Sequence, residues 1–347
     1  MEKQNIRQQK NNTLELLKLF SSYMVVFIHV RFSGYLGASI ETLSRFAVPF
    51  FFLISGFYSY GISTQKIRKR IRKISILSVF SIISYTIFNV LVLLSNNNWD
   101  NISDYFSKYG DFLCWLKFFI FNVPICSYHL WYLYAILYVY AVFYFVTKYD
   151  INDSVICIIS ISALILHFLA GSMLSAFGII LPDILIRNFA LMGLPFFALG
   201  LFSKKYQQKF LCIPNFVILL FVIIGISGCL LSRYFFGKKE LYIGSLFILF
   251  TFVCVFIKYP TIKYPKFLLA LEGCSTYIYI FHNMLSKSFE SIYATLGINL
   301  KSSVLLENLH PIIVCISSTL FSYILIKILK ILQKNKPNIH FQKVQTG

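Results

Sequence analysis

The chain has 347 residues, of which 58% are hydrophobic and only 13% are charged, and its mean hydropathy is +0.72. Because an average soluble domain is about one-quarter charged, this composition excludes a soluble globular fold and indicates an integral membrane protein. A formal net charge of +19 would suggest nucleic-acid binding in a soluble protein, but most lysines and arginines lie in short links between apolar runs, so we expect no nucleic-acid partner.

Apolar runs of about 20 residues recur along the chain, which is the length needed to cross about 30 Å of hydrocarbon at 1.5 Å per residue. The first run is of full span length and lacks an Ala-x-Ala-like cleavage site, so we expect a first span and not a removed signal peptide. The fold class predicted is an all-α, polytopic transmembrane helical bundle of about ten spans. They cover residues 14–31, 44–61, 74–94, 130–147, 154–173, 188–202, 216–233, 241–257, 267–286 and 312–331.

The first span carries polar side chains that are costly in a bilayer, which makes them candidates for function. At about 100° per residue, Lys18 and His29 lie within about 20° of each other around the helix and about 16 Å apart along it. Ser22 shares this stripe, and Glu15 lies one turn below Lys18. A histidine here suits proton transfer near neutral pH. The alternative is a hydrogen bond between helices, with Lys18 snorkelling to the interface.

Six cationic residues fall within Lys66–Lys73, in the link after the second span. Clusters of this kind anchor membrane topology. They would also meet a phosphate-rich donor arriving from the cytosol, with Arg70 and Arg72 offering bidentate contacts.

The longest predicted loop, residues 95–129, contains an apolar stretch at 112–123 that is short for a span and suggests a re-entrant or interfacial segment. Counting it as an eleventh span would place the C-terminus outside. Lysine and arginine are concentrated on one side of the ten-span arrangement, which predicts that both termini are cytoplasmic.

Two later spans carry polar or aromatic groups. The fourth span opens with Trp131, Tyr132 and Tyr134, which suggest an aromatic belt at the outer interface. The ninth span places Ser275, Tyr279 and His282 on one face at i, i+4 and i+7, with packing between helices as the alternative explanation.

The eight cysteines show no CxxC pairing, and we expect no metal site. Six of them lie in or beside apolar segments, where cysteine packs as a small hydrophobic residue. Cys114 and Cys126 share one outer loop, and their pairing remains open.

Taken in order, five segments resemble the acyltransferase 3 family of membrane acyltransferases, which includes enzymes that O-acetylate bacterial surface polysaccharides. They are LELLKLFSSYMVVFIHV, VPFFFLISGFY, HLWYLYAILYVY, IRNFALMGLPFFALG and EGCSTYIYIFH, and they extend from Leu14 to His282. The family pairs a cation with a histidine eleven residues later, which here corresponds to Lys18 and His29. It usually has arginine at the first of these positions.

The resemblance also implies ten core spans, an acyl-coenzyme A donor and an Arg-x-x-Arg motif after the second span. This chain offers Lys69-x-x-Arg72 and Arg70-x-x-Lys73 in its place, so the register stays open. We expect a cytoplasmic N-terminal tail at 1–13, an acyltransferase-like membrane domain at 14–333 and a cytoplasmic tail at 334–347.

The function expected is transfer of an acyl group, by default acetyl, from cytoplasmic acyl-CoA to a hydroxyl of an extracytoplasmic or lipid-linked polysaccharide. The protein would be a multi-pass protein of the bacterial cell membrane, with membrane lipids and the glycan as partners. His29 would act as general base or transient acyl carrier, supported by Lys18 and Glu15. The coenzyme phosphates would meet Lys69, Arg70, Arg72 and Lys73, and the acceptor would meet Arg45, Ser55, Arg187, Asn188, Ser275, Tyr279 and His282. The rival classes are a transporter or flippase and a glycan polymerase.

Overall fold

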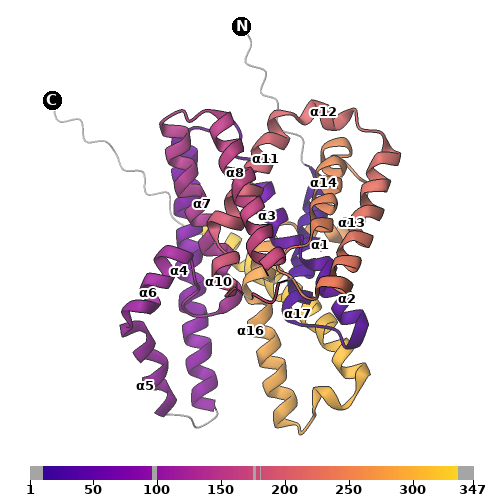
Figure 1. Cartoon of the computed structure of the whole chain (residues 1–347). Helices are drawn as coiled ribbons and strands as arrows, with labels where there is room; N and C mark the ends of the chain where they lie inside the picture. Colours follow the sequence, from indigo (N-terminus) through magenta and orange to yellow (C-terminus); the bar gives the residue numbers. More distant parts are fainter. Residues whose placement is uncertain (1–10, 96–99, 175–176, 180, 335–347) are drawn as a thin grey trace, which may run out of the picture.

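A computed structural model describes residues 11–95, 100–174, 177–179 and 181–334, and helices are the only regular secondary structure among these residues (Figure 1). The short α12 lies at one end of the bundle, and α5 and the connection from α16 to α17 lie at the other. The helices are α1 (Asn12–His29), α2 (Gly34–Ser44), α3 (Ala47–Phe57), α4 (Thr64–Ser95), α5 (Asp100–Ser107), α6 (Phe112–Phe121), α7 (Trp131–Lys148), α8 (Asp153–Phe168), α10 (Asp183–Ile186), α11 (Leu194–Lys205), α12 (Gln207–Leu211), α13 (Asn215–Phe236), α14 (Ile243–Lys258), α15 (Lys266–Ala270), α16 (Cys274–Thr295) and α17 (Val304–Lys334).

The predicted all-helical membrane fold is confirmed. Within the described ranges, six helical segments are long and apolar enough to cross a membrane: Gly34–Phe57, Thr64–Ser95, Tyr128–Lys148, Asp153–Gly171, Asn215–Phe236 and Val304–Gln333. The other four predicted spans correspond to α1, α11, α14 and α16, which are shorter or carry charges. Ten spans and cytoplasmic termini therefore stay predictions, and the predicted tails fall mostly on residues outside the described ranges.

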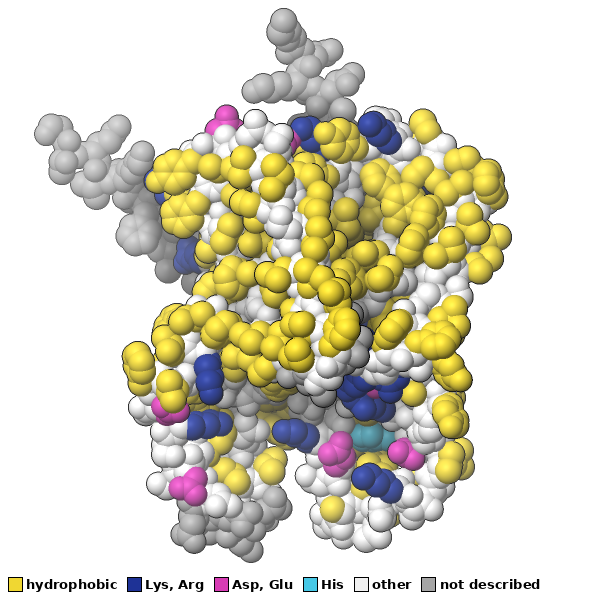
Figure 2. All heavy atoms as spheres, in the orientation of Figure 1, with side chains coloured by type: hydrophobic (Ala, Val, Ile, Leu, Met, Phe, Trp, Pro, Cys, Tyr) yellow, Lys and Arg dark blue, Asp and Glu magenta, His cyan; other side chains and the backbone are white. Residues whose placement is uncertain are grey.

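Figure 2 shows hydrophobic side chains over the upper and middle parts of the visible face, whereas charged side chains gather below this band and at its upper edge. This distribution is expected for a protein whose middle faces hydrocarbon.

Several predicted boundaries are wrong. The basic segment Lys66–Lys73 is not an extended link, because α4 begins at Thr64 and includes all six cations. The second span begins ten residues earlier than predicted, at Gly34. Its first helix, α2, contains polar residues that the prediction places outside the membrane, but their side chains are buried inside the protein. The helix of the ninth predicted span, α16, begins only at Cys274. Gly273 precedes it with a φ of 81°, a conformation that glycine readily adopts and that interrupts the helix.

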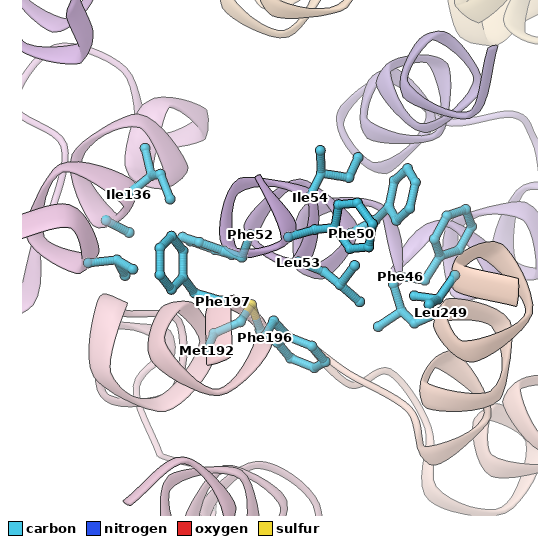
Figure 3. Packing of buried hydrophobic residues seen from close by; sticks show 14 of the residues in the cluster. Phe46, Phe50, Phe52, Leu53, Ile54, Ile136, Met192, Phe196, Phe197 and Leu249 are labelled. Atoms are coloured by element: carbon cyan, nitrogen blue, oxygen red, sulfur yellow. The ribbon is translucent and has the colours of Figure 1, made fainter. Parts of the chain in front are cut away.

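The core forms where α3 crosses α11. Figure 3 shows Phe52 and Leu53 of α3 beside Phe196 and Phe197 of α11, all of them buried. The helices approach so closely because Gly56 and Gly200 face the partner backbone. A Cβ atom at Gly200 would collide with the carbonyl oxygen of Leu53, so this crossing depends on glycine.

The helix α6, Phe112–Phe121, occupies most of the apolar stretch in the predicted outer loop. Its ten residues are too few to span a bilayer. Asn122 ends this helix in a left-handed conformation, and its Oδ1 accepts a hydrogen bond from the Phe189 N–H at 2.8 Å. All eight cysteines are free thiols, so Cys114 and Cys126 are not paired here.

Candidate active site

Three histidines from separate parts of the chain meet at one point, and we call them the histidine cluster. His29 ends α1, His129 lies in the 3-10 turn before α7, and His282 lies in α16. The ring centroid of His29 is 5.3 Å from that of His282 and 5.9 Å from that of His129. The centroids of His129 and His282 are 4.9 Å apart. The packing of these helices therefore brings three imidazoles into contact.

The three imidazoles differ in accessibility. His282 and His129 are 0% and 2% exposed, whereas the side chain of His29 is exposed. The exposed surface of His29 faces a charged cavity of about 230 Å³. His29 is therefore the member of the cluster that a substrate in this cavity can touch.

The hydrogen bonds of His282 leave one ring nitrogen as an acceptor. Its Nδ1 lies 2.9 Å from the carbonyl oxygen of Tyr279 and 3.1 Å from that of Ile278. A carbonyl oxygen only accepts, so Nδ1 of the neutral ring carries the proton and Nε2 carries the lone pair. The buried Nε2 atom has no hydrogen-bond partner within the described part of the chain. It is available to an N–H of the neighbouring His29.

His129, in contrast, is satisfied on both ring nitrogens. Its Nε2 donates to the carbonyl oxygen of Ile280 at 3.1 Å, and its Nδ1 lies 2.8 Å from the Ser127 hydroxyl. The Tyr279 hydroxyl donates to the His129 carbonyl oxygen at 2.6 Å. These bonds fix the ring against α16, so His129 builds the wall behind His29.

The charged cavity beside His29 is lined by more cations than carboxylates. Its charged side chains are Arg31, Arg45, Arg187 and Lys238 on the positive side and Asp183 and Glu240 on the negative side. Trp131 closes part of the wall and is itself buried. The residual positive charge favours an anionic or strongly polar occupant.

Ion pairs hold the cavity wall together across distant parts of the chain. Arg45 pairs with Glu240 at 3.0 Å and with Glu41 at 2.6 Å. Arg187 pairs with the other oxygen of Glu240 at 2.6 Å, and Lys238 pairs with Glu41 at 3.0 Å. The loop between α13 and α14 is thereby tied to α2 and to the segment that follows α10.

Glu240 and Arg187 lie outside the membrane-spanning helices, and their charges are mutually stabilised. Burial alone would raise the pKa of Glu240, but Arg45 and Arg187 outweigh it and hold the pKa below its usual range. Burial lowers the pKa of Arg187, whereas Glu240 reverses this effect and leaves the pKa raised. Both groups are therefore ionised at neutral pH.

A second set of charged side chains lies toward the N-terminal end of α1, away from the histidine cluster. Lys18 pairs with Glu15 at 2.6 Å, and its ammonium lies 5.9 Å from the centroid of the Tyr58 ring. The Tyr58 carbonyl oxygen accepts a hydrogen bond from Arg70 at 2.7 Å. The structure thus brings the charged end of α1 to the basic start of α4, about 16 Å along α1 from His29.

Polar side chains lead from Arg70 toward the histidine cluster. Arg70 donates to the Ser59 hydroxyl at 2.7 Å, and Ser59 donates to the Ser55 carbonyl oxygen at 2.6 Å. Tyr132 lies beside Ser55, and its ring packs edge-on against that of Tyr279 at 5.5 Å between centroids. Since Tyr279 is bonded to His129, side chains that carry hydroxyl groups lie between Arg70 and the histidine cluster.

The predicted site residues fall into two groups and two outliers. His282, Tyr279, Arg45 and Arg187 lie at or beside the histidine cluster, and Glu15, Lys18 and Arg70 lie at the opposite end with Ser55 between them. Ser275 lies about 10 Å from His282 along α16 and does not line the cavity. Asn188 caps the turn before α11 through its Oδ1, which accepts from the N–H groups of Ala190 and Leu191.

Lys69, Arg72 and Lys73 are exposed on α4, so their side chains are accessible to phosphate groups. Among the residues with described positions, no cluster of histidine, cysteine, aspartate and glutamate is arranged to hold a metal ion.

The sequence analysis missed His129, Glu41, Lys238 and Glu240. His129 stands directly before the aromatic run that suggested an interfacial belt, but Trp131 and Tyr134 are buried in the protein and do not form a belt. Glu41 in an apolar segment was the signal available for the ion-pair network, since a buried carboxylate needs a partner.

The profile of an acyltransferase domain, that of the acyltransferase 3 family, matches residues 11–327. This chain belongs to the acyltransferase 3 family. The resemblance inferred from five short segments is thereby confirmed, and the charged cavity lies within the matched domain of this membrane acyltransferase.

Part of this acyltransferase is also similar to an Enterococcus faecalis protein described as an amino-acid racemase, with 30% identity over 141 residues. The match covers 36% of the chain but only 18% of the racemase. No solved structure matches the acyltransferase.

Proposed function

We propose that this membrane acyltransferase moves an acetyl group from acetyl-CoA, on the cytoplasmic side, to a hydroxyl of an extracytoplasmic or lipid-linked polysaccharide in a bacterial cell membrane. The proposal is carried by His29, the one exposed imidazole of the histidine cluster, at the wall of a cation-rich cavity. A base that is packed against two further imidazoles and open to a polar cavity suits removal of a hydroxyl proton.

In this reaction the acceptor hydroxyl oxygen attacks the thioester carbonyl carbon while His29 takes the hydroxyl proton. The tetrahedral intermediate collapses, the carbon–sulfur bond breaks, and the sulfur leaves as a thiolate that receives the proton from His29. One ester forms and one thioester is consumed. We propose that during the reaction His29 turns one ring N–H toward the unpartnered Nε2 of His282, which orients the opposite ring nitrogen toward the hydroxyl.

The donor fits the basic start of α4. Its exposed cations Lys69, Arg72 and Lys73 match the phosphates of the coenzyme in charge. Arg70 differs from them, because its guanidinium is engaged by Tyr58 and Ser59. We therefore assign phosphate contact to Lys69, Arg72 and Lys73, and assign Arg70 to the entrance through which the arm of the coenzyme passes toward Ser55.

The acceptor fits the charged cavity. The Nε atom of Arg45 is buried and has no hydrogen-bond partner within the described ranges, although both terminal nitrogens of this side chain are paired. An acceptor oxygen that accepts from this N–H would be held beside His29. Arg187 also lines the cavity, is paired with the same Glu240, and supplies a second cation.

The racemase activity of the Enterococcus faecalis relative is not proposed for this chain, because the matched part is only 18% of that protein. A transporter or a polymerase remains a rival in a polytopic chain, and neither acylates a glycan.

The decisive experiment supplies radiolabelled acetyl-CoA to membranes that contain this protein and measures label in the glycan fraction. We expect label to pass to glycan in an alkali-labile ester, and membranes from cells that lack the protein serve as the control. Glycan that is moved or polymerised without gaining label would favour a rival class.

A further inference from the structure

An apolar groove lies on the outside of α1, away from the charged cavity. It has a volume of about 330 Å³ and is walled by α1, α2, α13 and α14. Phe20 of α1 and Ile226 of α13 are 45% and 40% exposed at its mouth, so the groove opens sideways toward the bilayer. Its apolar walls suit a hydrocarbon chain.

The groove and His29 face opposite ways around α1. Phe27 follows Phe20 by seven residues, which returns it to within about 20° of the same direction. His29 follows Phe20 by nine residues and is rotated about 180° from it. A thioester at the end of a chain in the groove would have α1 between itself and His29. The groove therefore suits an anchor better than a reacting group.

The linings of the two sites come close in sequence at the end of α1. The helix ends at His29, and the chain turns through Arg31 and Phe32. The Phe32 ring contacts Phe27 in the groove at 4.9 Å between centroids, whereas the Arg31 side chain lines the charged cavity. Arg31 is half exposed and pairs with Glu41 at 3.1 Å. A molecule with one apolar and one polar part can pass this corner without crossing the protein.

The charged side chains at the end of α1 determine which polar headgroup can bind there. Arg31 and Lys238 are each close to half exposed, and both converge on a single carboxylate, that of Glu41. Glu41 is further paired with Arg45, so three cations share one anion at this point. This arrangement attracts an anionic headgroup.

We propose that the apolar groove holds the lipid chain of a lipid-linked acceptor, whose phosphate lies at Arg31 and Lys238 and whose glycan enters the charged cavity. The assignment rests on the proposed function, because it specifies which acceptor that reaction uses. Anchoring the lipid on one side of α1 confines the glycan near His29 on the other and raises its local concentration there.

Binding is tested on the purified full chain in detergent by native mass spectrometry, with a long isoprenoid phosphate as the probe. We expect it to be retained in preference to the uncharged isoprenoid alcohol and to phosphatidylglycerol. Arg31→Ala should weaken retention about fivefold, because one cation is lost near the phosphate, and Arg31→Lys should restore it.

Ile226→Trp fills the groove mouth and should weaken retention at least as much. Ile223→Trp is the matched control, because Ile223 is 57% exposed on the same helix and does not line the groove. Equal retention of the phosphate and the alcohol, equal retention of phosphatidylglycerol, or an unchanged Ile226→Trp variant would each overturn the proposal.

The binding measurement is independent of acyl transfer. His29→Ala should retain the isoprenoid phosphate at the native level. If binding follows these expectations while no acetyl group is transferred, the proposed function fails and the groove assignment stands. If acetyl transfer proceeds while Ile226→Trp leaves binding unchanged, the groove assignment fails and the proposed function stands.

Discussion

At the scale of single residues, His29 differs from its two neighbours in its exposure and in its hydrogen bonds. Both ring nitrogens of His129 are hydrogen-bonded, to Ile280 and Ser127. The Nε2 atom of His282 has no hydrogen-bond partner among the described residues. Three equivalent imidazoles would make no distinction between base and support. The packing leaves His29 accessible from the charged cavity and encloses the other two.

His282→Ala is expected to lower kcat for acetyl transfer about a hundredfold, because His29 loses the acceptor that orients it. The KM for acetyl-CoA should stay within about twofold of the native value, since the proposed phosphate contacts are made by the basic start of α4 and not by His282. Steady-state kinetics in membranes check both values. Ser275→Ala is the matched control on the same helix, and equal losses in the two variants would contradict a positioning role.

Glu240 is the residue on which the cavity wall depends most. It pairs with Arg45 and Arg187 and is 13% exposed, so Glu240→Gln removes one carboxylate from each of two largely buried guanidinium groups and leaves Arg45 with Glu41 and Arg187 with Asp183. We expect a loss of about 3–5 kcal/mol in the free energy of unfolding. Asp183→Asn removes a partner of Arg187 that is 54% exposed and should cost less than about 1 kcal/mol. Thermal unfolding in detergent compares the two variants.

The same ion pairs set a pH dependence. Because the pKa of Glu240 is lowered in the folded protein, its contribution to stability is complete above the ordinary carboxyl pKa and is lost as pH falls through the lowered value. The melting temperature should therefore decline below about pH 5, and this part of the decline should be absent in Glu240→Gln. A decline of the same size in the variant would contradict the assignment.

Part of this site could be predicted from the sequence, and part could not. His29 and His282 stand out because each is a histidine in an apolar helix, where a polar group is costly. His129 does not, since it precedes Trp131 and resembles the edge of an aromatic belt. The pairing of Glu41 with Lys238 joins residues about 200 positions apart, and no local pattern reports a contact of that kind.

At the scale of elements, the crossing of α3 and α11 places Ser55 and Ser59 next to the Arg70 end of the bundle. Gly56 and Gly200 allow this crossing because each lies against the partner backbone. Small residues at helix contacts are the usual means of close approach in membranes.

Gly200→Ala is expected to destabilise the protein by about 3 kcal/mol, because the new Cβ atom meets the Leu53 carbonyl oxygen and the helices must separate. Gly110→Ala is the matched control, since open space surrounds that position. The midpoint of thermal unfolding in detergent measures both. Equal midpoints for the two variants would contradict the packing described.

Helix existence was predictable from runs of apolar residues, whereas several helix ends were not. The start of α4 was missed because its first two turns are basic, and cations there were assigned to a link. The start of α16 was missed because the apolar residues before Gly273 belong to the separate α15. In both places the backbone conformation, and not hydropathy, sets the boundary.

At the scale of the whole molecule, the histidine cluster and the Lys18–Glu15 ion pair lie toward opposite ends of α1, and hydroxyl-bearing side chains of α3 and α7 lie between them. This arrangement suits a donor and an acceptor that approach from different sides of a membrane. It requires the basic start of α4 to face the cytoplasm.

Topology can be tested with reporters fused to each terminus. We expect activity from a cytoplasm-active reporter at both ends and none from a reporter that is active only outside, because the cationic links anchor on the cytoplasmic side. A reporter inserted after Lys301, in the connection between α16 and α17, is the control and should show the opposite pattern. An outside C-terminus would contradict the ten-span arrangement.

The central claim is that His29 removes the proton from an acceptor hydroxyl. It is tested most directly by measuring glycan O-acetylation in cells that carry His29→Ala, with the amount of protein in the membrane shown to be unchanged. The account predicts that acetylation falls at least about a hundredfold. Acetylation at the native level would contradict it.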